Sequence, residues 1–322
     1  MKDWAGAGYF APTLEPRYHV FMSATPTSLE EVIAPLTLDE FLGFLRRREL
    51  VYCSGGDECQ FKSLLNWESL LERIRAGAYP RGFADFRIVK ESKNISAAHW
   101  FIRTPVDDST KVDIAKLEEF LASGYSLVIT PIQPHVPVLA KLADNLAATL
   151  REQIKIGVVV TTGAGGAFKL HFDPEDLIIL QVEGTKRWRI YGPVVANPVI
   201  GMPPPPAPPE NDPIFDEILK PGDMLFLPAG YWHHCENGPG RSMHLGIFLI
   251  PPTYLHVAKA LVSRLVSDEK FRLPLTRVVH ASELEELETD LKDSLIQKIR
   301  ELELRGFLAE ADKKETDSIS QA

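Results

Sequence analysis

The segment His171-Phe172-Asp173 contains two side-chain types that ligate metal ions, an imidazole and a carboxylate, spaced two residues apart. In a β-strand, residues two apart point to the same face, so His171 and Asp173 would project together while Phe172 faces the other way. A third ligand must come from elsewhere, and the best candidate is His233 in the segment 226–234. Two histidines and one carboxylate on one side of an iron(II) ion leave positions open for substrates, as in non-haem iron oxygenases.

A His-x-Asp pair on its own is weak support for a metal site. The chain has nine histidines, so such a pair can arise by chance, and a hydrogen-bonded pair at the surface is its usual outcome. A second histidine in a β segment punctuated by glycine and proline favours the metal site. We therefore predict His171, Asp173 and His233 as the metal ligands and catalytic residues. His234 should face away from them.

Lys186 is the leading candidate for binding a small anionic cosubstrate. It follows a predicted turn at Gly184-Thr185, and a buried lysine there can bind the distal carboxylate of a small molecule. The alternative is an exposed lysine at a hairpin, as most turn lysines are. Arg187 should point to the opposite face, so one of the two is expected to face inward. Three further residues are candidates for binding the cosubstrate: Thr161, Ser242 and His244.

The first half of the chain is mostly helical in pattern. Thr37 and Glu40 form a capping box ahead of apolar residues at helical spacing, which predicts the start of a helix. Apolar residues recur at helical spacing over 61–74 as well. Two more helices are predicted over 113–121 and 136–150. One short buried strand is predicted between them, over 126–130.

From Lys155 the pattern changes to short β-branched and apolar runs separated by glycine and proline. Gly184-Thr185 is predicted as the hairpin turn between two of these runs. The proline-rich stretch 202–209 cannot lie inside a sheet and is predicted as a surface loop. Such a series indicates an antiparallel barrel or jelly roll, with strands over 156–162, 177–182, 187–191, 224–227 and 243–250.

The predicted fold is α+β: a double-stranded β-helix, which is a cupin or jelly-roll barrel, with N-terminal helical elements and a C-terminal helical region. In chain order we predict an N-terminal arm, a catalytic barrel with its helical elements, a C-terminal helical region and a disordered tail, at 1–35, 36–252, 253–310 and 311–322.

The C-terminal region is predicted to hold two helices, over 254–266 and 283–304. The second is rich in charge and has apolar residues at steps of three and four. These residues can pack on the barrel of the same chain, or they can join two chains in a homodimer, which is the interpretation we favour. They are Leu284, Leu287, Leu291, Leu295 and Ile299.

The composition is that of an ordinary soluble globular protein, with 45% hydrophobic and 25% charged residues in 322. The net charge of -9 argues against direct, sequence-independent binding of nucleic acid, which needs an excess of lysine and arginine. The three cysteines have no paired zinc-site spacing. Neither a signal peptide nor a run of about 20 apolar residues is found, so we expect a cytoplasmic protein without a membrane span.

The sequence resembles the JmjC-domain, cupin-like family that includes the ribosomal oxygenases. The resemblance rests on four stretches in the same order, spacing and apolar pattern as in the family. They are HFDPED from His171, LIILQVEGTKRW from Leu177, PGDMLFLPAGYWH from Pro221, and Ser242-Met243-His244.

The resemblance implies iron(II), 2-oxoglutarate and O2, with His171, Asp173 and His233 as the metal triad. Lys186 matches the basic residue that pairs with the far carboxylate of 2-oxoglutarate. Three positions depart from the pattern of the family. The places of an asparagine and a tyrosine that help to hold 2-oxoglutarate are Gly157 and Val159, and Phe248 stands where a polar residue is common.

The resemblance predicts a dioxygenase that hydroxylates an amino-acid side chain of a protein or peptide and converts 2-oxoglutarate to succinate and carbon dioxide. About seventy residues follow the barrel, fewer than a helical dimerisation region plus a winged helix would need, so a ribosomal-protein substrate does not follow. The alternative is a metal-binding cupin, an isomerase or sensor, that acts on a small molecule without 2-oxoglutarate. A catalytically silent scaffold is a third hypothesis.

Overall fold

The computed structural model divides into two compact units, 1–250 and 251–322, which are described separately. It describes residues 13–14, 25–55, 57–77, 86–103, 110–163, 165–193, 195–203, 205–208, 212–274 and 280–303. Most of the predicted arm 1–35, part of the loop 202–209 and all of the tail 311–322 lie outside the described residues.

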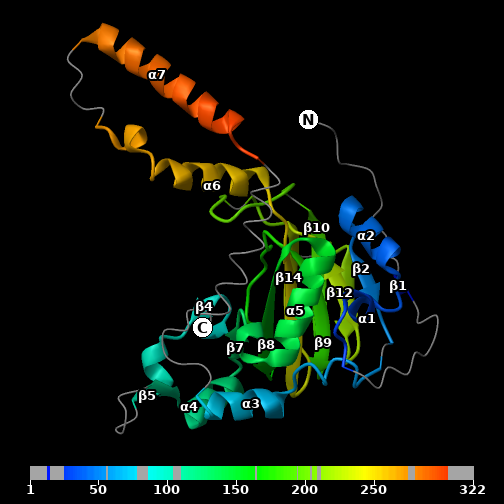
Figure 1. Cartoon of the computed structure of the whole chain (residues 1–322). Helices are drawn as coiled ribbons and strands as arrows, with labels where there is room; N and C mark the ends of the chain where they lie inside the picture. Colours follow the sequence, from blue (N-terminus) through cyan, green and yellow to red (C-terminus); the bar gives the residue numbers. More distant parts are fainter. Residues whose placement is uncertain are drawn as a thin grey trace. The chain divides into compact units, whose positions relative to one another are not determined.

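The first unit is built on a nine-stranded sheet in the order β1-β2-β12-β9-β14-β8-β7-β3-β4 (Figure 1). Its central strands pair antiparallel, and β14 pairs along its length with β8. In sequence order the strands are Thr13–Leu14, Val51–Cys53, Phe86–Lys90, Lys93–Asn94, Ser126–Ile129, Gln153–Thr162, Asp176–Glu183, Met224–Leu227 and Arg241–Ile250.

A smaller sheet has three antiparallel strands, in the order β11 (Phe215–Leu219), β10 (Lys186–Pro193) and β13 (Tyr231–Asn237). Its apolar side chains, such as Trp188 and Ile190, share one buried cluster with Leu177 and Ile179 of the large sheet. Two antiparallel sheets packed through a common core confirm the predicted cupin-like barrel within an α+β fold.

The opposite face of the large sheet is covered by helices. The alternation along β9 sends Ile178 and Leu180 into a second core with the helices, while Leu177 and Ile179 face the small sheet. Helix α5 lies over this outer face in Figure 1. The helices of the first unit are α1 Leu29–Ile33, α2 Leu38–Arg47, α3 Trp67–Arg75, α4 Ile114–Ala122 and α5 Pro137–Leu150.

The helix starts follow the capping chemistry. The predicted capping box of Thr37 and Glu40 is present at the start of α2. Within 61–74, only the second half is α-helical, because Asn66 caps a helix that begins at Trp67. The preceding residues form turns in which Phe61 and Leu64 are nonetheless buried, so their apolar spacing reflects burial in a turn rather than a helix.

The predicted hairpin at Gly184-Thr185 is wrong. β9 pairs with β12 and β14, whereas β10 pairs with β11 and β13, so the chain crosses from one sheet to the other at this turn. Gly184 has a φ of +60°, and a Cβ atom there would collide with the backbone carbonyl of Arg241. Glycine is therefore required for a tight crossing beside β14, not for a two-residue hairpin.

The second unit contains α6 (Tyr254–Leu265) and α7 (Ala281–Arg300), close to the two helices predicted from the sequence. On α7, four of the residues in the predicted apolar series are more than a third exposed: Leu284, Leu287, Leu291 and Ile299. Among the described residues, no helix combines the length and the apolar character needed to cross a membrane.

Candidate metal centre

A backbone bridge between His171 and His233 brings two of the three predicted ligands together. The amide of His171 donates to the carbonyl of His233 at 3.1 Å, and the reverse bond is 2.7 Å long. Directly paired residues carry their side chains on one face, and the two imidazole centroids are 4.2 Å apart. The bridge therefore fixes both rings at the same edge of the barrel.

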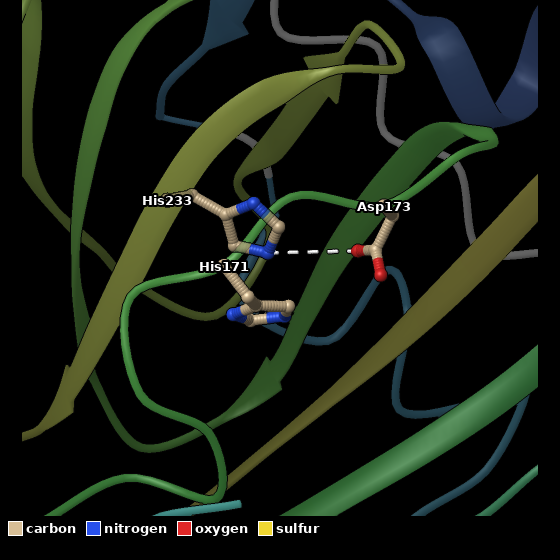
Figure 2. Close-up of side chains that lie close together, drawn as sticks. All are labelled: His171, Asp173 and His233. Atoms are coloured by element: carbon tan, nitrogen blue, oxygen red, sulfur yellow. Dashed lines mark ion pairs between the residues drawn. The ribbon is translucent and has the colours of Figure 1, made fainter. Parts of the chain in front are cut away.

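Asp173 completes the cluster from a segment that is not a regular strand beyond His171. Its carbonyl accepts a hydrogen bond from the amide of Gly230 at 2.9 Å, which continues the pairing begun by the histidines. Its carboxylate lies 3.6 Å from Nε2 of His233. The ligand atoms of His171, Asp173 and His233 all lie within 4.8 Å of one another, and Figure 2 shows the three side chains converging.

Backbone carbonyls select the tautomer of both histidines. Nδ1 of His171 lies 2.7 Å from the carbonyl of Lys169, and Nδ1 of His233 lies 3.2 Å from the carbonyl of Tyr231. A carbonyl only accepts, so each Nδ1 carries a proton, which leaves Nε2 as the nitrogen able to ligate a metal ion. Burial, together with the nearby His171, lowers the pKa of His233 to about 4, so its ring is neutral at pH 7. Two imidazoles that each present Nε2, together with a carboxylate, fit a divalent iron ion.

A cavity of about 400 Å³ contains this cluster and Lys186. Lys186 is 2% exposed, and its Nζ lies 3.3 Å from Oγ1 of Thr161 and 3.4 Å from Nδ1 of His244. Burial lowers the pKa of Lys186 to about 8. In the part of the chain that the structure describes, no carboxylate forms an ion pair with this lysine, so an anion entering the cavity would find an uncompensated cation.

Arg187 faces the other way, as the alternation along β10 predicts. Its guanidinium forms two hydrogen bonds to the exposed carboxylate of Asp216, at 2.6 and 2.7 Å. One of the two basic residues therefore faces inward, and it is Lys186.

The three other predicted cosubstrate residues do not share one location. Thr161 and His244 both contact Lys186, and His244 also lines the cavity. Ser242 is buried, and its hydroxyl is bonded to the side-chain amide of Gln181 at 3.0 Å. The residues found to line the cavity do not include Ser242.

Several cavity residues were not predicted as site residues, although Trp188 was expected to be a core or barrel-lining residue. Trp188 stacks on the ring of His233 with centroids 5.7 Å apart, and Cys235 follows His233 by two positions on β13, a spacing that could have identified it. Arg87 on β3 and Thr130 after β7 also line the cavity. These two residues reach it only because β3 and β7 join the large sheet, and no local pattern predicts that pairing.

The positions that depart from the family pattern lie on the cavity wall. Gly157 and Gly246 are opposite each other on β8 and β14, and both line the cavity. The edge of the Phe248 ring lies 3.3 Å from the place of a Cβ atom on Gly157 and 3.7 Å from that on Gly246. The phenyl ring therefore fills the space that the paired glycines leave.

Comparison with known proteins shows what this chain is similar to. Residues 133–257 match the JmjC domain family. An uncharacterized protein of Bacillus subtilis, YxbC, is 29% identical over 309 residues, which cover 87% of this chain and 89% of that protein. The bifunctional lysine-specific demethylase and histidyl-hydroxylase NO66 of Drosophila willistoni is 33% identical over 137 residues, covering 39% of this chain and only 17% of that protein.

The fold is also similar to that of the ribosomal oxygenase YcfD from Escherichia coli, solved in complex with cobalt and 2-oxoglutarate. The TM-score is 0.50 at 18% sequence identity, and the match covers 81% of this chain and 67% of that chain. At this identity the likeness supports the architecture of the barrel.

Proposed function

We propose, on the premise that residues 133–257 match the JmjC domain family, that the chain is an iron(II)- and 2-oxoglutarate-dependent dioxygenase that hydroxylates an amino-acid side chain of a protein or peptide. The observation that carries this proposal is one cavity that holds both the His171, Asp173 and His233 cluster and the buried Lys186. A metal-binding cupin without an anionic cosubstrate has no need of an uncompensated lysine in the same cavity.

His171, Asp173 and His233 would hold iron(II) through two Nε2 atoms and one carboxylate oxygen. The bound iron supplies the activation of O2 that the side chains cannot perform themselves. The protein keeps the ligands in one geometry through the bridge between the two histidines and the carbonyl partners of their Nδ1 atoms. Trp188, stacked on His233, shields that ligand from water on one side.

Lys186 would bind the far carboxylate of 2-oxoglutarate, with the hydroxyl of Thr161 as a second donor. The desolvation that lowers the pKa of Lys186 also strengthens its attraction for a carboxylate, because few waters compete at a fully buried ammonium. His244 lies against the same Nζ and limits where the carboxylate can sit.

The names of related proteins support a protein or peptide substrate. NO66 is called a lysine-specific demethylase and histidyl-hydroxylase, and YcfD is called a ribosomal oxygenase. Oxidation of a C–H bond is common to hydroxylation and to demethylation of an N-methyl group, so both outcomes start from the same site chemistry. We propose hydroxylation of a side chain as the activity of this chain.

The alternative is a metal-binding cupin that acts on a small molecule without 2-oxoglutarate. It is favoured by the absence of polar side chains at Gly157, Val159 and Phe248 on the cavity wall. Both functions require the metal triad, but only the dioxygenase requires a dicarboxylate to reach Lys186.

Anaerobic titration with 2-oxoglutarate separates the two functions. The protein loaded with iron(II) should develop the metal-to-ligand charge-transfer band of a chelated keto acid. Lys186→Ala should remove the band at the same 2-oxoglutarate concentration, while Arg187→Ala, which changes the neighbouring outward residue, should keep it. Bound iron without a band in the wild-type protein would reject the dioxygenase and leave the small-molecule cupin.

We also propose that two copies of the chain associate through the C-terminal helices. The exposed Leu284, Leu287 and Leu291 of α7 support this proposal. Light scattering should give the mass of a dimer, and Leu287→Glu together with Leu291→Glu should give a monomer. A monomeric mass for the wild-type chain would contradict the proposal.

A further inference from the structure

Arg87 lies in the wall of the metal cavity with an unsatisfied hydrogen-bond donor. It projects from β3, opposite Val128 of β7, and both residues line the cavity. Its Nε is buried and has no hydrogen-bond acceptor. Its guanidinium carbon is 6.0 Å from the centroid of the Phe168 ring, which places it near the face of an aromatic side chain.

Phe168 connects this guanidinium to the metal cluster. The Phe168 ring is 5.2 Å from the ring of the metal ligand His171, so Arg87, Phe168 and His171 form a continuous row along the cavity wall. Lys186 instead contacts Thr161, whose hydroxyl bonds to Ser126 at 2.8 Å. The two cations therefore occupy separate places in one cavity.

The other charges on the cavity wall already have partners or roles. Asp173 belongs to the metal cluster, and Lys186 is assigned to 2-oxoglutarate. Burial raises the pKa of Glu175, Asp173 adds to this effect, and Lys155 opposes it, so Lys155 and Glu175 lie close enough to interact. Among the described residues, Arg87 is the one cavity-lining cation with neither an acidic partner nor a proposed role.

We propose that Arg87 is a specificity residue that binds a carboxylate carried by the substrate, next to the group that enters beside His171. A guanidinium presents parallel N–H donors that match a carboxylate, and its planar form suits a site against the ring of Phe168. The inference rests on the proposed function and names its substrate class: a peptide with an aspartate or glutamate close to the oxidised residue.

Ligand-observed NMR can test this binding without turnover. The full chain, loaded with zinc(II) and 2-oxoglutarate, is mixed with capped hexapeptide pools that differ only in carrying one Glu or one Gln. N-acetylglutamate and N-acetylglutamine form a second pair, which tells a peptide acid from a small free acid. The Glu pool should bind roughly tenfold or more tightly than the Gln pool, as expected for a hydrogen bond to a charged group.

Variants at the same position assign the preference to Arg87. Arg87→Gln should abolish the preference for Glu, Arg87→Lys should keep part of it, and Arg87→Glu should favour a matched pool carrying Lys. Arg46→Gln, at an exposed arginine of α2, is the control and should bind as the wild type does. Urea denaturation of each variant checks that it is folded.

Two results would overturn the inference: equal binding of the acid and amide members in both pairs, or a Glu preference that survives in Arg87→Gln. Arg87→Gln could instead lose 2-oxoglutarate binding while its binding of the peptide pools stays unchanged. This result would also overturn the inference, because it assigns Arg87 to the cosubstrate. Succinate release by the iron(II)-loaded wild-type protein is measured separately. If succinate and 2-oxoglutarate binding are both absent while the Glu preference holds, the dioxygenase fails and the carboxylate site stands.

Discussion

The carboxylate of Asp176 accepts a hydrogen bond from the backbone amide of Ala229 at 2.7 Å. Asp176 follows the proposed metal ligand Asp173 by three residues, and Ala229 precedes His233 by four. The adjacent Gly230 donates its amide to the carbonyl of Asp173. Asp176 therefore holds together the two segments that supply all three ligands, although it does not touch the metal cluster.

Asp176→Ala should weaken metal binding without unfolding the barrel. The amide of Ala229 would lose its acceptor, and the turn before His233 could drift relative to Asp173. Loss of a residue that orients ligands lowers metal affinity by roughly 10-fold to 100-fold. Anaerobic titration with iron(II) or cobalt(II) measures this change. Asp176→Asn keeps an acceptor oxygen and should recover much of the affinity.

Asp216→Ala is the matched control, because Asp216 is an acidic residue of the barrel bonded to the outward Arg187. It should leave the metal affinity as in the wild type. Equal affinities for Asp176→Ala and Asp216→Ala would show that the bond from Ala229 does not position the ligands.

Lys186→Met should stabilise the protein at neutral pH in the absence of 2-oxoglutarate. Burial lowers the pKa of Lys186 from its ordinary value of 10.5 to about 8 in the folded protein. A lysine whose pKa is lower in the folded than in the unfolded protein reduces the free energy of unfolding. This reduction is complete below pH 8 and fades as the pH rises toward 10.5. The variant should gain up to about 3 kcal/mol in the free energy of unfolding at pH 7, and less at about pH 9.5.

Urea denaturation at pH 7 and pH 9.5 measures this gain, with the exposed Lys220→Met as the control. With 2-oxoglutarate present, the wild-type protein should be more stable than Lys186→Met, because the dianion stabilises the folded protein through Lys186 and cannot do so in the variant. A variant that is less stable than the wild type at both pH values, by the same amount, would show that Lys186 is not buried in its charged form.

Features that depend on residue types and spacing close together in the sequence could be predicted. The triad follows from the order and types of His171, Asp173 and His233, which the bridge brings together as expected. The start of α2 follows from Thr37 and Glu40, since capping is decided within four residues. The alternation of side chains along a strand predicted that one of Lys186 and Arg187 faces inward, and the structure shows that it is Lys186.

The features that depend on pairing between distant strands could not be predicted. Gly184 indicates a tight turn both in a hairpin and in a crossing between two sheets. Only the pairing of β9 with β12 and β14 decides that β9 does not pair with β10. Strand β13 contains the adjacent polar residues His233 and His234 and lacks the apolar pattern that gave bounds to other strands, so only a β segment around His233 was predicted. Arg87 reaches the cavity through the pairing of β3 with β7, which no local spacing encodes.

Asp223→Ala should destabilise the barrel while leaving the metal ligands in place. Asp223 is 3% exposed and accepts hydrogen bonds from the hydroxyl of Tyr52 at 2.8 Å and from the amides of Gly55 and Lys220. Removal of the carboxylate leaves three donors without an acceptor, and we expect a loss of about 3 kcal/mol or more. Tyr52→Phe removes one donor and should lose only about 1 kcal/mol.

Urea denaturation of both variants measures these losses. The slope of the unfolding transition should stay constant, because the change affects bonding rather than the surface exposed on unfolding. A loss in Asp223→Ala no greater than in Tyr52→Phe would mean that solvent satisfies the two freed amides.

Gly157→Ala should destabilise the protein because the cavity wall has no room for a methyl group. A Cβ atom at this position would overlap Oγ1 of Thr130 and press on the ring of Phe248. Overpacking of this kind costs about 1–3 kcal/mol in the free energy of unfolding. The same crowding excludes the larger asparagine often found here in the JmjC family, so Thr130 and Phe248 determine the shape of this wall.

A double-mutant cycle with Thr130→Ala tests this explanation by urea denaturation. Thr130→Ala removes the overlapping oxygen, so adding Gly157→Ala to it should be nearly neutral, with a coupling of at least about 1 kcal/mol between the two sites. Gly192→Ala is the control, because no atom lies within 4 Å of a Cβ atom there. If the effects of the two substitutions simply add, the collision with Thr130 is relieved by other movements. Glycine at position 157 would then be explained by a need to keep the cavity open, and not by a lack of room for a side chain.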